Sequence, residues 1–200
     1  MISQDDIDAM RANGYDPGTI LEAENQLQHC ARGSKIADRI RSAFSGVTLG
    51  KGVGLKESRG KDDYEGAETL AKYRANDEKD DWERIPIEEL NNASGGLCFF
   101  DAEGMRFHLP AYLIADLRGE YNFGMDFNLT HLSEHCLEQF ALVNREQRQC
   151  VRDFLIHILD DPDYGLFNNE RIHAALHSYW TDEEDKPAEQ GGDGDAEEAV

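Results

Sequence analysis

One stretch of this chain, residues 97–118, places the strongest constraint on its fold. It reads LCFFDAEGMRFHLPAYLIADLR and is the most apolar and aromatic window of a 200-residue protein whose formal net charge is −21. Such a segment must be buried, because apolar surface is driven out of water while charged side chains stay solvated. We therefore expect the rest of the chain to be arranged around this stretch and to cover it.

Two local structures fit the first half of this stretch. Gly104 suits a tight turn that would make residues 97–107 a short β-hairpin. Alternatively, Asp101 caps a helical turn that runs toward His108, since its side chain can accept from the free N–H groups of a first helical turn. We favour the helical alternative. Pro110 is then expected in the first turn of a following helix.

Apolar residues recur at helical spacing through most of the remaining chain, so the fold is predicted to be mainly α, a compact multi-helix domain. Residues 1–33 are predicted to hold two short helices with thin apolar stripes, which together form a helical N-terminal arm. A separate helix is expected to begin at Ser34 and to bury Phe44. Later in the chain, Asn144 and Gln147 have the spacing of a capping box at the start of the best-formed amphipathic helix.

A glycine-rich segment lies between these helical regions, over residues 46–66. Its sequence, GVTLGKGVGLKESRGKDDYEG, has six glycines and little periodicity, which predicts a long, partly ordered loop. The glycines around Lys51 do not have the GxxxxGK[ST] spacing of a phosphate-binding loop, and they follow a helix rather than a strand. We therefore expect a plain loop. Trp82, beyond it, is expected to have a buried ring and a bonded N–H.

The domain is predicted to span residues 34–180 and to be followed by an acidic tail. Residues 181–200 contain nine carboxylates and one lysine and few apolar side chains, so we expect them to be disordered. The predicted core consists of Phe44, Trp82, Phe100, Phe107, Leu113, Leu117, Phe140, Val151, Phe154, Leu155 and Leu176.

The charge constrains the class of partner. The tail accounts for about −8 of the net charge, which leaves about −13 on the first 180 residues. Nucleic acids and anionic membranes are bound through lysine and arginine, so we expect neither as a partner. An acidic surface favours solubility or a basic protein partner.

The cysteine pattern and the first residues bear on the compartment. Cys30, Cys98, Cys136 and Cys150 form no CxxC pair, which favours reduced thiols over a disulfide framework. The start of the chain, MISQDDIDAM, lacks the apolar region of a signal peptide, and no window has the length of a membrane span. We expect a cytoplasmic protein.

Histidines supply the candidate metal ligands. His131 and His135 flank Glu134 in an HxxEH pattern, which in inverted zinc peptidases places two ligands and a general base on one helix. His173 and His177 also lie one helical turn apart, and the two pairs together could form a four-histidine site if their helices are neighbours. Chance spacing explains both pairs as well, and the chain lacks the larger context of such enzymes. We therefore assign no metal, cofactor or catalytic residue.

Four polar or aromatic side chains of the central stretch form a second candidate. Asp101, Arg106, His108 and Tyr112 interrupt or border an otherwise apolar run. Such groups must be paired internally or held at a surface groove. We expect internal pairing, with Arg106 bonded to a carboxylate. The alternative is an open pocket lined by these residues.

Several ordered motifs resemble those of the DUF6714 family of bacterial proteins. The most specific is FFDAEGMRFHLPAYL, which follows GVTLGKGVGL, DDYEGA and DEKDDWERIP and precedes REQRQCVRDFLIHIL and ALHSYW. The resemblance covers about residues 34–180. It implies a small, mainly helical domain with no assigned reaction, and it transfers no catalytic residue.

Three functional hypotheses follow. The first is a non-enzymatic interaction module for a basic protein, with neutralisation of a toxin, as immunity proteins do, as its sharpest form. The second is a metal-dependent enzyme that uses the paired histidines. The third is a mimic of nucleic acid that occupies the site of a DNA-binding protein. No motif in the sequence decides among them.

Overall fold

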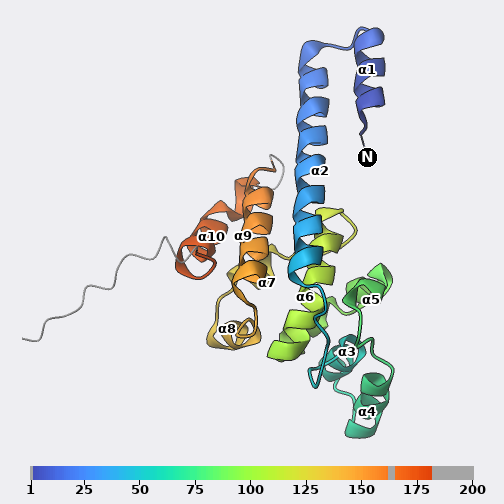
Figure 1. Ribbon diagram of the computed structural model, residues 1–200, viewed down its shortest axis with the longest axis vertical. Coiled ribbons are helices and arrows are strands. Elements are labelled where there is room, and N and C mark those ends of the chain that lie inside the picture. The colour runs from blue at the N-terminus through green and yellow to red at the C-terminus, as the bar shows by residue number, and fades with distance from the viewer. Residues whose placement is uncertain (1, 162–164, 182–200) are drawn as a thin grey trace, which may run out of the picture.

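The computed structural model describes residues 2–161 and 165–181, with the side chains of 165–168 left out. The α-helices are α1 (Gln4–Ala12), α2 (Pro17–Ala43), α3 (Leu55–Asp62), α4 (Ala67–Ala75), α5 (Ile87–Asn92), α6 (Ala102–Leu117), α7 (Asp126–Thr130), α8 (Glu134–Gln139), α9 (Arg145–Leu159) and α10 (Gly165–Ser178). Two 3₁₀-helices, η1 (Trp82–Arg84) and η2 (Ser94–Phe99), lie between α4 and α6. The fold is mainly α and compact, as predicted (Figure 1). The predicted disordered tail lies outside the described residues, apart from Thr181.

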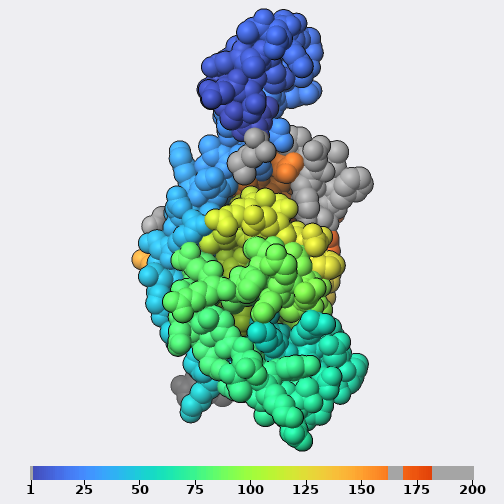
Figure 2. Space-filling model, turned by 90° about the vertical axis from the view of Figure 1, so that its right-hand side faces the viewer, coloured from blue at the N-terminus to red at the C-terminus, as the bar shows by residue number. Residues whose placement is uncertain are grey.

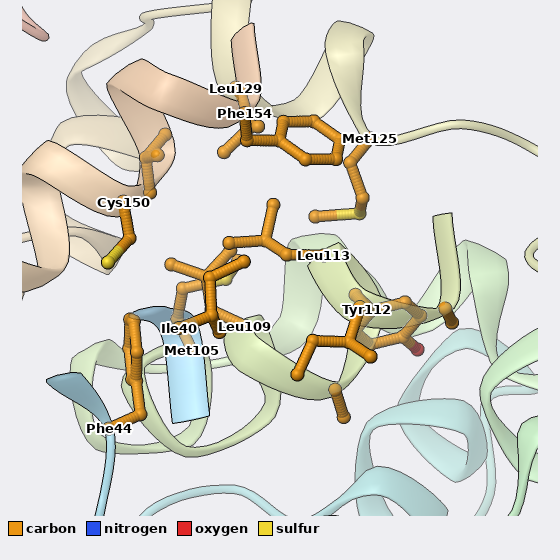
Figure 3. Close-up of a cluster of buried hydrophobic side chains, with 14 of the residues drawn as sticks. Ile40, Phe44, Met105, Leu109, Tyr112, Leu113, Met125, Leu129, Cys150 and Phe154 are labelled. Atoms are coloured by element: carbon orange, nitrogen blue, oxygen red, sulfur yellow. The ribbon is translucent and has the colours of Figure 1, made fainter. Parts of the chain in front are cut away.

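Helix α6 is the centre of the domain. Every residue from Phe107 to Ala115 is buried, so the helix has no solvated face over more than two turns. It contacts α2, α8, α9 and η1. Figure 3 shows side chains of α6, among them Leu109 and Leu113, between Ile40 of α2 and Phe154 of α9. The apolar stretch is therefore covered by the rest of the chain, as its sequence requires.

The β-hairpin alternative for residues 97–107 is wrong. No strand occurs in the described part of the chain, and η2 occupies the position of the first predicted strand. Asp101 is the N-cap of α6 and accepts from the N–H of Gly104 at 2.8 Å. This cap supplies an acceptor to a free donor of the first turn, which favours the helix over the turn.

Pro110 lies inside α6, and the prediction that it opens a new helix is wrong. Because Asp101 starts the helix two turns earlier, Pro110 falls in its interior. There its ring removes the hydrogen bond that would run to the carbonyl of Arg106. Burial on all sides holds the helix together through this position.

Helix α2 is continuous across residues 33 and 34, where the sequence predicts two separate helices. Ser34 does not act as a cap; its hydroxyl donates to the carbonyl of Cys30 at 3.0 Å, within the helix. Gly33 is buried against His157 of α9 instead of ending the helix. The prediction of a break there is wrong, because packing outweighs the low helix propensity of glycine.

The glycine-rich segment is not the partly ordered loop that its composition predicts. It contains α3. The buried carboxylate of Asp77 accepts hydrogen bonds from the first N–H groups of this helix, those of Lys56 and Glu57, at 2.7 and 3.3 Å. A Cβ atom on Gly54 would lie 2.1 Å from Asp77 Oδ2. The glycine therefore permits a close approach of backbone to side chain.

The predicted core is confirmed, with Leu117 half-buried at its edge. Trp82 is 5% exposed, and its Nε1–H donates to the carbonyl of Phe44 at 3.1 Å, as expected. The predicted capping box at Asn144 and Gln147 is present at the start of α9. All four cysteines are free thiols.

Candidate functional site

His108 and Tyr112 lie in the interior, one turn apart on α6. The His108 ring is 1% exposed and stacks on Phe100, with ring centroids 4.4 Å apart. Its Nδ1 lies 2.7 Å from the carbonyl of Gly104, so this nitrogen carries the proton and donates. Tyr112 donates to the carbonyl of Leu90 at 3.4 Å. Neither side chain faces an opening.

Burial keeps the His108 ring neutral. It lowers the pKa of His108 to about 4, and the hydrogen bond to Gly104 opposes the shift only in part. Among the described residues, Nε2 of this ring has no hydrogen-bond partner. The neutral ring is thus bonded through Nδ1 alone, and its burial leaves no access for proton transfer to or from a ligand.

Arg106 and Asp101 are bonded to neighbouring elements rather than to each other. Arg106 Nε donates to the side-chain oxygen of Gln147 at 3.1 Å, not to a carboxylate as we expected. The Gln147 amide in turn donates to the carbonyl of Ala43 at 3.0 Å. Asp101 also accepts from the N–H of Val53 at 3.0 Å. These contacts join α6 to α9, α2 and the glycine-rich segment.

Gln147 is the residue of this network that sequence reasoning missed. It is 1% exposed and links three helices, yet the sequence identifies it only as the second member of a capping box. The available signal was its place on the inward face of an amphipathic helix, in line with Val151, Phe154 and Leu155. A polar residue at such a position must find buried partners.

The HxxEH histidines do not share a helix. His131 is the C-cap of α7 and stacks on Phe127, whereas His135 belongs to α8 and lies 2.8 Å from the carbonyl of Cys98. The N-cap of α8, Ser133, separates them. The geometry of two ligands one helical turn apart therefore does not form, because the chain changes direction inside the motif.

His173 and His177 do share a face, on α10, and line a cavity of about 740 Å³ between α9 and α10. His131 and His135 do not line it. Nδ1–H of His177 donates a hydrogen bond to the carbonyl of His173 at 2.7 Å. Arg152, also in the lining, donates to the carbonyl of Trp180 at 3.1 Å, near the end of α10. The four histidines thus do not converge, and no group of three metal-ligating side chains occurs among the described residues.

The N-terminal arm consists of α1 and the first turns of α2. Helix α1 packs against the first turns of α2, and Figures 1 and 2 show this pair projecting beyond the body of the domain. Ile7 and Ala23 are buried in the pair, and Arg11 forms ion pairs with Asp8 and Glu24. The arm is thus a folded helical hairpin rather than an extended strand of chain.

The surface of this arm is acidic, with two large apolar side chains. Residues 2–28 contain six carboxylates and one arginine, a formal charge of −5. Tyr15 and Leu21 are 54% and 56% exposed. Single exposed apolar side chains are normal on a protein surface, so the concentrated charge and the projection are what distinguish the arm.

These observations define a compact helical domain that carries a projecting helical arm. The chain matches the family of unknown function DUF6714 over residues 32–184, and it belongs to this family. The resemblance that the central motif suggested is therefore confirmed. The arm up to residue 31 lies outside the matched region. No curated protein and no solved structure matches the chain significantly.

Proposed function

We propose that this protein is a cytoplasmic interaction module that binds a basic protein partner through its N-terminal arm. Neutralisation of a toxin is the sharpest form of this proposal. The observation that carries it is the arm itself, an acidic hairpin with exposed Tyr15 and Leu21 that projects from the domain. A charge of −5 there would steer a basic partner and speed its association at low salt.

The other hypotheses gain less from the geometry. A metal-dependent enzyme has no ligand cluster among the described residues to support it. Within these residues, no helix is long and apolar enough to cross a membrane. A nucleic-acid mimic remains a hypothesis, and competition between this protein and DNA for a candidate partner tests it.

The test is co-purification from the source cells at low salt, with two charge-reversal variants. Asp5→Lys with Glu22→Lys reverses two exposed charges of the arm, and Glu134→Lys with Glu138→Lys makes the same change in charge on α8. We expect a basic protein to be recovered with wild type and the α8 variant, and at least tenfold less with the arm variant.

Two outcomes would contradict the proposal. Equal loss of the partner in both variants would show that total charge, not the arm, determines binding. Recovery of no basic protein at low salt, with no protection of cells from the product of an adjacent gene, would remove the interaction function altogether.

A further inference from the structure

Two stacked imidazoles lie where the arm leaves the domain. His29, on α2, and His157, on α9, have ring centroids 3.8 Å apart and an interplanar angle of 19°. They sit one turn on the arm side of Gly33, the glycine in the interior of α2. On the N-terminal side of the stack α2 packs on α1, and on the C-terminal side it packs on α9 and α6 (Figure 1). The stack therefore marks the base of the arm.

The His157 ring is enclosed and incompletely bonded. It is 5% exposed, and its Nδ1 has no hydrogen-bond partner among the described residues. A Cβ atom at Gly33 would lie 3.1 Å from its Nε2, so the ring fits against α2 only because residue 33 has no side chain. Glycine is also the weakest helix former after proline, which makes this position the easiest place for α2 to bend.

The charged groups that face His157 come from both helices. His29 and Arg32 approach from α2, and Asp160 and Asp161 follow the end of α9. Arg32 pairs with Asp160, and Nε2 of His29 lies 3.9 Å from Asp161. Helix α6 contributes the apolar side chain of Leu117, near Gly33.

We propose that the His29–His157 stack is a proton-operated latch that holds the arm in line with the domain, and that protonation of His157 frees α2 to bend at Gly33. This inference rests on the proposed function, since it makes the presentation of the arm to its partner dependent on pH. Two neutral rings can stack at van der Waals distance. A second positive charge beside Arg32, in a buried site, opposes that contact.

The direction of the pH effect follows from the two states. Burial, then His29 and Arg32, lower the pKa of His157 to about 4 in the closed latch, while an exposed imidazole has a pKa of about 6.5. The open state therefore takes up a proton more readily below pH ~6.5. The closed latch is fully stable above that pH. Its equilibrium constant falls about fivefold over the first pH unit below pH ~6.5 and somewhat more over the next, and it levels off near pH ~4.

Amide hydrogen exchange in the full-length protein tests the latch directly. Bending at Gly33 breaks the helical hydrogen bonds around residues 29–36, so exchange there reports opening. After correction for the intrinsic rate, we expect protection of this segment to fall about fivefold from pH 6.5 to 5.5. Residues 105–115, in α6, exchange through global unfolding, so their protection should exceed that of residues 29–36 at every pH.

The variant His157→Phe keeps a buried aromatic ring and removes the proton. It should make protection of residues 29–36 independent of pH, whereas the matched control His173→Phe, at an exposed position on α10, should behave as wild type. If His157→Phe does not fold, His29→Phe replaces the other ring of the stack and should likewise reduce the pH dependence.

The latch would be refuted if wild-type protection did not change with pH, or if His157→Phe and His173→Phe showed the same fall. Binding to a basic partner at pH 7.5, where the latch is closed, is a separate measurement. Binding without a pH-dependent change in protection would support the proposed function and refute the latch. A pH-dependent change without binding would support the latch and not the proposed function.

Discussion

Helix α2 belongs to two different regions, and the change takes place within a single helix at Gly33. On the domain side it buries Ile36, Ala37 and Ile40, while on the arm side only Ala23 is buried. The domain part of α2 is therefore packed into the core, whereas most of the arm part is exposed. The comparison indicates that the domain supplies stability and the arm supplies surface, and substitutions on either side can test this division.

The largest effect on the free energy of unfolding is expected for a substitution at the centre of α6. Leu113 is fully buried, and Leu113→Ala should lower the free energy of unfolding by about 3–4 kcal/mol, because it removes buried methyl groups and leaves a cavity. Leu21→Ala in the arm should cost less than about 0.5 kcal/mol. Urea titrations of both variants measure the difference. Equal losses would show that the arm and the domain share one core.

The second effect is expected in the glycine-rich segment. Gly54→Ala would place a methyl group 2.1 Å from Asp77, so we expect a loss of about 2–3 kcal/mol as the carboxylate is pushed from the N–H groups of α3. Gly66→Ala, where nothing lies within 4 Å, should cost under about 1 kcal/mol. Thermal or urea unfolding of this pair decides whether the segment is packed like α6 or open like the arm.

Much of the fold was predictable because its main signals are local. The apolar run of residues 97–118 identifies the buried helix, and Asp101 and Asn144 are correctly predicted as caps. Two features depend on distant contacts instead. Gly33 continues a helix because it packs on His157, and Gly54 belongs to an ordered segment because Asp77 comes close to it. Glycine alone predicts the end of a helix at the first position and a loop at the second.

The candidate sites were less predictable for the same reason. A pattern such as HxxEH assumes one helix, and only tertiary packing shows that His131 and His135 lie on either side of a turn. His157 is on a well-predicted helix, but its partner His29 is far away in the sequence. No local signal joins them.

The third effect concerns pH and the buried histidine of α6. The pKa of His108 is lowered by burial to about 4, below that of an exposed histidine, so the unfolded chain binds the proton more readily. The stability that this group contributes is present above pH ~6.5 and is lost as pH falls toward 4, by about 1 kcal/mol between pH 6.5 and 5.5. His108→Phe should reduce the acid-induced loss by this amount, and His177→Phe, at an exposed position, should not change it.

The comparison must be made between variants rather than from the wild-type slope alone. Burial raises the pKa of Asp116 to about 6, which stabilises the folded state as pH falls and so opposes the histidines. This contribution cancels when His108→Phe and His177→Phe are compared by urea unfolding at each pH. Identical slopes in the two variants would show that His108 can be protonated without loss of the fold.

The smallest effect on stability, and the one most specific to the arm, is expected for Leu21→Ser. Leu21 is 56% exposed, so the free energy of unfolding should change by less than about 0.5 kcal/mol. If the arm binds the partner, loss of this apolar contact should weaken binding by about tenfold, the size of effect typical of a contributing interface residue. Leu142→Ser, at a position 44% exposed outside the arm, is the matched control. Calorimetric titration of the recovered partner into both variants gives the affinities. An unchanged affinity for Leu21→Ser would leave the charges and Tyr15 to account for binding by the arm. An unfolding midpoint lowered as far as that of Leu113→Ala would show that the arm is part of the core.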